Sequence, residues 1–128
     1  MKWIRHLLPL LVSCSAMAEL SDEARRGEQV FNERDKGHCL LCHSLSGNRS
    51  SFQGNLGPPL DGVAKRMTKD ELIRRIADSR VFNSETIMPP YFSVEGLRQV
   101  GSDYVDKTVL TENELSDLVS YLLSDNDE

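Results

Sequence analysis

Cysteine, histidine and aromatic side chains are scarce in this 128-residue sequence. It contains three Cys, three His and one Trp, and aromatic residues make up 6% of the chain. Three cysteines cannot form a network of structural disulfides, and two of them, Cys39 and Cys42, lie close together in the sequence. The length indicates a single domain. A small domain with few aromatic residues and no disulfides needs another source of stability.

Long apolar runs are also absent, and none reaches the roughly 20 residues that a membrane-spanning helix requires. The first eighteen residues have the pattern of an export signal, in which Lys2 and Arg5 precede a short apolar stretch and a small-x-small cleavage site ends at Ala18. We therefore expect a signal peptide over residues 1–18 and a periplasmic domain over residues 19–128. The sequence before Cys14 also resembles a lipobox, so lipoprotein cleavage before Cys14 is the alternative.

Basic residues are in the minority. Without Lys2 and Arg5, 13 of the 15 Lys and Arg residues remain against 20 Asp and Glu, a net charge of −7. An acidic domain of this kind is a poor match for nucleic acid, whose phosphates attract basic surfaces. It favours a basic docking surface on a protein partner.

The cysteines that are present form a C-x-x-C-H motif with the histidine that follows them, Cys39 to His43. This spacing is the attachment signature of a c-type haem. On one helical turn, the thiols of Cys39 and Cys42 can each add to a vinyl group of the porphyrin. His43 is then placed to bind the iron as proximal ligand. The motif predicts one covalently bound haem c.

Two other roles for the cysteine pair fit less well. A thioredoxin-like dithiol needs a preceding strand in a βαβ unit, whereas the residues before Cys39 have a helical pattern. A zinc site needs two further ligands, and outside the cysteines residues 19–128 contain only His38 and His43.

The second axial position of the iron calls for a methionine. His6 lies in the export signal, and His38 directly precedes the first attachment cysteine and cannot reach the opposite haem face. Met67 fits core packing, whereas Met88 lies in a proline-stiffened segment that can pass over the far side. We predict ligation by His43 and Met88, which raises the reduction potential and leaves no open iron site. Such a site favours electron transfer, with no catalytic residue on this chain.

The other ring N–H of His43 should need a hydrogen-bond acceptor. Pro58 is the candidate, because its carbonyl lies in a stiff segment one loop away; a simple turn is the alternative. Three arginines could form ion pairs with haem propionates, but we expect each on a solvated helix face: Arg66, Arg74 and Arg75.

Helical periodicity and caps predict an all-α fold. Ser21 caps a helix that runs to about Asn32, and capping boxes beginning at Thr68 and Thr111 open two others. The last helix has the clearest apolar stripe in the chain. A further helical turn is expected within residues 96–100, and no strand is expected.

These features together resemble the class I cytochrome c family. Gly27-x-x-x-Phe31 resembles the motif of its N-terminal helix, and residues 118–122 resemble that of the C-terminal helix that crosses it near Gly27 and Tyr121. Gly57-Pro58 and Met88-Pro89 match the segments that carry the proximal acceptor and the distal ligand. The resemblance implies helices packed around one haem.

The resemblance is closer to the SoxX family of the periplasmic sulfur-oxidation system. It departs from that family at His38 and Leu41, where Asn and Ala are expected. The matching segments are Gly37-x-Cys39-Leu40-x-Cys42-His43, Gly57-Pro58-Pro59-Leu60, Thr86-Ile87-Met88-Pro89-Pro90, Gly96-Leu97-x-x-Val100 and Lys107-x-x-Leu110-Thr111.

Membership of that family would imply a partner and a reaction. SoxX pairs with the haem subunit SoxA in SoxAX, an L-cysteine S-thiosulfotransferase that couples thiosulfate oxidatively to a cysteine of the carrier SoxYZ. The SoxX-like chain would accept the electrons and pass them to a soluble cytochrome, with the chemistry on SoxA. The alternatives are a free-standing electron shuttle for an oxidase or reductase, and a haem-based sensor, which would need an open iron site.

Overall fold

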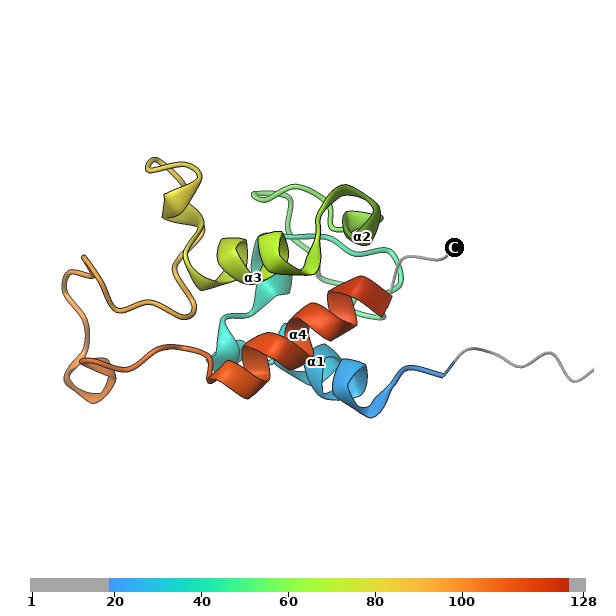
Figure 1. The fold of residues 1–128 in the computed structure, drawn as a ribbon, viewed down its shortest axis with the longest axis horizontal. Coiled ribbons are helices and arrows are strands. Elements are labelled where there is room, and N and C mark those ends of the chain that lie inside the picture. The colour runs from blue at the N-terminus through green and yellow to red at the C-terminus, as the bar shows by residue number, and fades with distance from the viewer. Residues whose placement is uncertain (1–18, 125–128) are drawn as a thin grey trace, which may run out of the picture.

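The computed structural model describes residues 19–124, and the expected signal peptide lies outside them. The frame of the molecule is the crossing of its first and last long helices, α1 (Asp22–Asn32) and α4 (Glu112–Ser124) (Figure 1). A Cβ at Gly27 would overlap the backbone of Asp117, so the closest approach of the helices depends on the missing side chain. Phe31 of α1 packs against Tyr121 of α4, with 5.4 Å between their ring centroids. The crossing predicted from the sequence is confirmed.

The helices begin where their capping residues predict. The hydroxyl of Ser21 accepts a hydrogen bond from the backbone N–H of Ala24, and Thr68 forms a reciprocal capping box with Glu71. Thr111 and Glu114 exchange the same pair of hydrogen bonds before α4. These bonds satisfy backbone donors that the first turn of a helix leaves unpaired.

Two shorter helices, α2 (Val63–Arg66) and α3 (Lys69–Ala77), come between α1 and α4 in the sequence. Both contact α4. The sequence predicts α3 to continue to about Arg80, but Asp78 has extended backbone angles and ends it. Its carboxylate then accepts from the N–H of Arg80 and opens a 3₁₀ turn at Ser79–Val81. Residues 19–124 contain helices and turns and no strand, so the fold is all-α as expected.

Residues 93–109 leave the helical body as a long excursion, drawn in orange in Figure 1. None of these residues is buried, and the chain returns at Leu110, which is 1% exposed. The helical turn expected within residues 96–100 is wrong, because Gly96 and Gln99 have positive φ angles that a right-handed helix does not accept. The helical turn of the excursion lies instead at Ser102–Tyr104.

The core is one apolar cluster under the helix crossing. Its largest fully buried side chains are Phe31, Leu45, Val63, Leu110 and Val119. No helix in residues 19–124 combines the length and apolar character needed to cross a bilayer.

Candidate functional site

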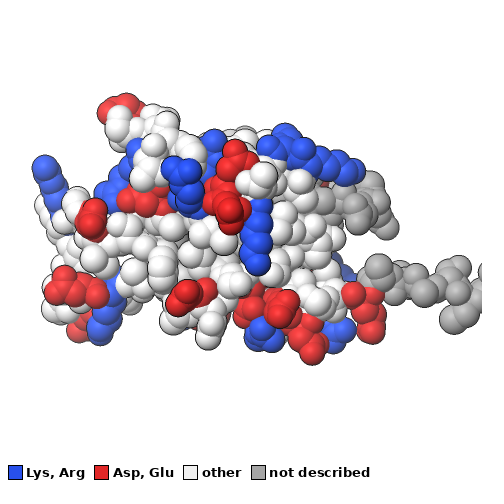
Figure 2. All heavy atoms as spheres, viewed as in Figure 1, with Lys and Arg blue, Asp and Glu red and all other residues white. Residues whose placement is uncertain are grey.

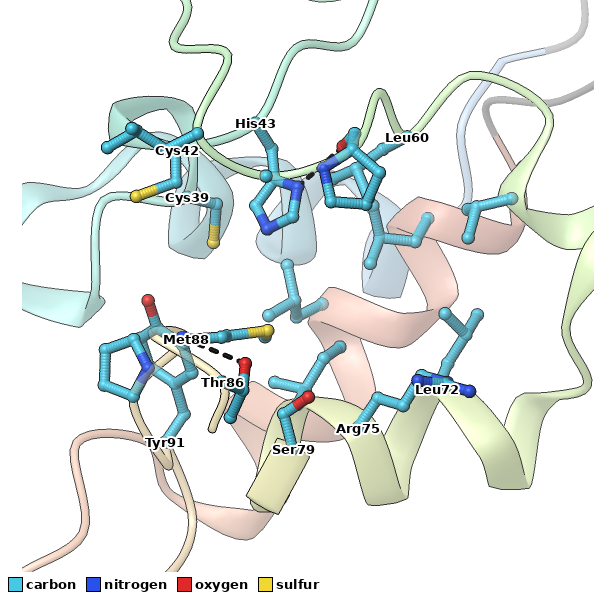
Figure 3. A pocket seen from close by; sticks show the side chains of 18 of the residues that line it. Cys39, Cys42, His43, Leu60, Leu72, Arg75, Ser79, Thr86, Met88 and Tyr91 are labelled. Atoms are coloured by element: carbon cyan, nitrogen blue, oxygen red, sulfur yellow. Dashed lines mark hydrogen bonds between the residues drawn. The ribbon is translucent and has the colours of Figure 1, made fainter. Parts of the chain in front are cut away.

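A cavity of about 340 Å³ opens into this core, which places it among ordinary cofactor pockets of roughly 300–1,000 Å³. Its walls are mainly apolar, and α4 contributes Leu118 and Leu122 to them. The residues of the C-x-x-C-H motif and the Met88 segment lie on opposite sides of this space (Figure 3). The structure thus brings together residues that lie far apart in the sequence.

The attachment cysteines lie on a tight turn. Cys39–Leu41 is a 3₁₀ turn, and the backbone N–H groups of Cys42 and His43 both donate to the carbonyl of Cys39. This geometry aims both sulfur atoms at the cavity (Figure 3). The two thiols are free, and burial raises the pKa of Cys39 to about 11. The turn therefore presents two neighbouring thiols to one ligand, as two thioether bonds require.

The ring of His43 extends into the same cavity and is oriented by a backbone contact. Its Nδ1 lies 2.8 Å from the carbonyl oxygen of Pro58. Because a carbonyl only accepts, Nδ1 carries the proton in this arrangement, and Nε2 is left as the basic nitrogen. The N–H of Gly57 donates to the carbonyl of Cys42 at 2.7 Å, which holds the Pro58 segment beside the motif.

Met88 lies across the cavity from His43 (Figure 3). It is half-buried, and its backbone N–H donates to the hydroxyl of Thr86 at 3.2 Å. Pro89 and Pro90 follow and stiffen the chain. Met67 lines the cavity too, directly after the end of α2. Met88 lies on the wall that faces the histidine.

His38, the remaining histidine of the described chain, lines the cavity beside Cys39. Its position directly before Cys39 places it on the same segment as His43, and its backbone is left-handed, with φ of 45°. Residues 19–124 hold no cluster of three or more His, Cys, Asp or Glu side chains suited to a free metal ion.

Arg75 was expected on a solvated helix face, but its side chain lines the cavity. The guanidinium stacks on Phe82, 4.2 Å from the ring centroid. Its Nε is buried and has no hydrogen-bond partner in the described chain. A buried donor without an acceptor is costly unless a ligand supplies one.

These features fit a haem. Cys39 and Cys42 would hold the porphyrin through thioethers, the apolar walls would cover its faces, and a propionate would give Arg75 Nε an acceptor. His43 and Met88 lie on opposite sides of the cavity and would be available to hold the iron.

Sequence reasoning missed one residue of the site, Tyr91, and expected another, Arg75, on a solvated helix face. Arg75 belongs to a helix whose exposed face also carries Arg74, so periodicity alone did not separate the two. Tyr91 is 8% exposed and lines the cavity. The signal that was available for it is its position three residues after Met88, in Met88-Pro89-Pro90-Tyr91.

Comparisons with known proteins agree with this geometry. The family described as Cytochrome c matches residues 24–125. The crystal structure of SoxXA from P. pantotrophus superimposes with a TM-score of 0.72 and 24% identity, over 81% of this chain and 82% of that chain. The methylamine utilization protein MauG of Methylophilus methylotrophus is 27% identical over 115 residues, which cover 85% of this chain and 34% of MauG. This chain thus spans about a third of that relative's length.

The matched region extends over most of the chain and includes the motif, the cavity and both crossing helices. The all-α fold agrees with a class I arrangement, and the cofactor of such a protein is covalently bound haem c. This chain therefore belongs to the cytochrome c family and is a haem electron-transfer protein.

Proposed function

We propose that this protein is the SoxX-like, electron-accepting subunit of a periplasmic SoxAX complex. The observation that carries the proposal is the likeness of its fold to SoxXA over 81% of the chain. It is supported by the sequence segments shared with the SoxX family, which run from the haem motif to the start of α4. The excursion at 93–109 lies among these segments.

In this proposal His43 and Met88 bind the iron, and bound haem supplies a one-electron redox centre. The support is geometric: Nε2 of His43 is left free by the Pro58 contact, and Met88 lies on the opposite wall. With both axial positions filled by side chains, substrate has no place at the iron. The protein's part is then to hold the two ligands in place and keep water out.

The chemistry would take place on the partner. A thiol of SoxYZ and thiosulfate would form a sulfur–sulfur bond on SoxA, releasing one proton and two electrons. A single haem takes one electron at a time, so this subunit would pass the first electron to a soluble cytochrome before it accepts the second.

If the protein is a subunit, the excursion at residues 93–109 would contribute to the interface with the partner. Six of its apolar side chains are at least 36% exposed, namely Val94, Leu97, Val100, Tyr104, Val105 and Val109. Exposed apolar side chains that form a contiguous patch often mark protein interfaces, and these six belong to one exposed segment. Lys and Arg are interspersed with Asp and Glu on the face shown in Figure 2, which gives no large region of one sign there.

Co-expression with SoxA tests the proposal. We expect a stable complex, and we expect its haem on this subunit to be reduced when thiosulfate and SoxYZ are added. Val105→Glu should weaken the complex, whereas Phe52→Glu, at a residue that is 89% exposed outside the excursion, should not. A monomer that does not bind SoxA and that turns over rapidly with an oxidase would show a free-standing shuttle instead.

A further inference from the structure

Tyr91 joins the two segments that face each other across the cavity. We infer that it is a positioning residue, which fastens the Met88 segment to the haem-attachment segment and thereby holds the Met88 sulfur at the iron. The inference rests on the proposed ligation by Met88 and adds to it the residue that keeps that ligand in place.

The first contact is between the Tyr91 side chain and Gly37. The Tyr91 hydroxyl donates to the Gly37 carbonyl at 3.1 Å. The ring lies so close to Gly37 that a Cβ there would overlap it. Gly37 also has φ of 115°, a conformation that only glycine adopts readily. Since Gly37 is two residues before Cys39, this contact fixes Tyr91 to the segment that carries the thioethers.

The backbone of Tyr91 is fixed as well. Its N–H donates to the carbonyl of Ile76 in α3 at 3.2 Å, and its carbonyl accepts from the N–H of Leu110 at 2.9 Å. Tyr91 therefore ties α3, the start of α4 and the attachment segment to one point. Burial raises the pKa of its phenol to about 12, so the hydroxyl remains protonated and able to donate well above neutral pH.

The rest of the Met88 segment has no comparable anchor. The hydrogen bonds of residues 83–90 are local and reach back no further than Ser79. Only Pro89 and Pro90 separate Met88 from Tyr91, and their rings restrict the backbone between them. A displacement of Tyr91 would therefore also displace Met88, because the backbone between them has little conformational freedom.

The fraction of ferric protein in which Met88 has left the iron offers a direct measure. Imidazole binds only to that open fraction, so its apparent affinity rises in proportion to it. In Tyr91→Phe, which keeps the ring and removes the hydroxyl, we expect imidazole to bind roughly fivefold tighter, the factor that one net hydrogen bond represents. Tyr91→Leu, which also removes the ring, should show a larger increase and a weakened Met-to-iron charge-transfer band.

Two tyrosines provide controls. Tyr104→Phe changes an exposed residue and should alter neither imidazole affinity nor thermal stability. Tyr121→Phe changes a buried hydroxyl in the helix crossing, which accepts from Asn48 at 3.4 Å. It should lower the melting temperature and leave imidazole affinity unchanged. A general loss of stability is thereby separated from a specific effect on the ligand.

The inference is overturned if Tyr91→Phe melts at a lower temperature but binds imidazole like the wild type. It is also overturned if the wild-type ferric protein lacks a charge-transfer band, or if Met88→Ala retains it, because Met88 is then not the ligand. Only the latter results contradict the proposed ligation. Loss of SoxA binding would leave the inference about Tyr91 intact, so the two proposals fail separately.

Discussion

The helix crossing and the Met88 segment are held in position by different kinds of interaction. In the crossing, buried side chains on two regular helices meet, and stability comes from the area that they remove from water. In the Met88 segment the chain is irregular, and a few hydrogen bonds and two prolines determine its position. Packing therefore stabilises the fold, whereas the geometry of the redox site depends on a small number of directed contacts.

The largest effect should come from breaking the crossing. Phe31→Ala removes a fully buried ring and should lower the free energy of unfolding by about 3–5 kcal/mol. Chemical denaturation of the haem-loaded protein measures this. Phe52→Ala, at an 89% exposed position, should change stability by less than about 0.5 kcal/mol. Equal losses in the two variants would contradict the view that packing at the crossing carries the fold.

Breaking the Met88 segment should affect the iron more than the fold. We expect Met88→Ala to abolish the Met-to-iron charge-transfer band and to lower the reduction potential by on the order of 100 mV, a part of the ~0.8 V range that axial ligands span. Spectroelectrochemistry measures both. Met67→Ala is the matched control at the same cavity and should retain the band; if it loses the band instead, the ligand assignment is reversed.

The cap of α4 should make a smaller, pH-dependent contribution to the stability of the crossing. Glu114 accepts hydrogen bonds from Thr111 and pairs with Lys36 at 2.9 Å, and these contacts lower its pKa below the ordinary 4.5. A carboxylate whose pKa is lower in the folded state stabilises above its unfolded pKa, and this contribution is lost as the pH falls through the folded value. Glu114→Gln keeps an acceptor for the capping box but removes the charge, so it should cost up to about 1 kcal/mol at neutral pH, and the difference from wild type should shrink below about pH 4.5.

The smallest effect is expected at Arg75. Arg75→Leu removes a positive charge and should lower the reduction potential by roughly 30 mV, which corresponds to a loss of about 0.7 kcal/mol in the stability of the reduced haem relative to the oxidised haem. Potentiometry at several pH values measures it. Arg74, the neighbouring residue in α3, contacts the same ring of Phe82 but is exposed. Arg74→Leu should therefore leave the reduction potential unchanged. Identical potentials in both variants and wild type would contradict a propionate contact at Arg75 Nε.

The regular parts of this molecule were predictable from sequence because local signals determine them. Ser21, Thr68 and Thr111 mark the helix starts through bonds made within one turn, and Gly27 marks the crossing because only a small residue fits there. The C-x-x-C-H motif likewise sets the positions of its two sulfur atoms within five residues. Short-range geometry is enough in each of these cases.

The contacts across the cavity were not predictable in the same way. Tyr91 and Gly37 are 54 residues apart, and nothing in the composition of either segment identifies the other as its partner. The orientation of Arg75 depends on where α3 lies against Phe82, which periodicity does not specify. The turn expected within residues 96–100 failed because backbone angles at Gly96 and Gln99 depend on how the excursion leaves the body.

The crossing of the first and last helices has a consequence for biosynthesis. The partner of α1 is α4, about 80 residues further along the chain, so the apolar face of α1 stays uncovered until Glu112–Ser124 has been made. Leu118 and Leu122 of the same helix complete the cavity. A chain that stops before α4 therefore lacks both its core and a wall of its cofactor site. Contacts between such distant segments form slowly, and incomplete chains should be open to proteolysis before any cofactor is retained.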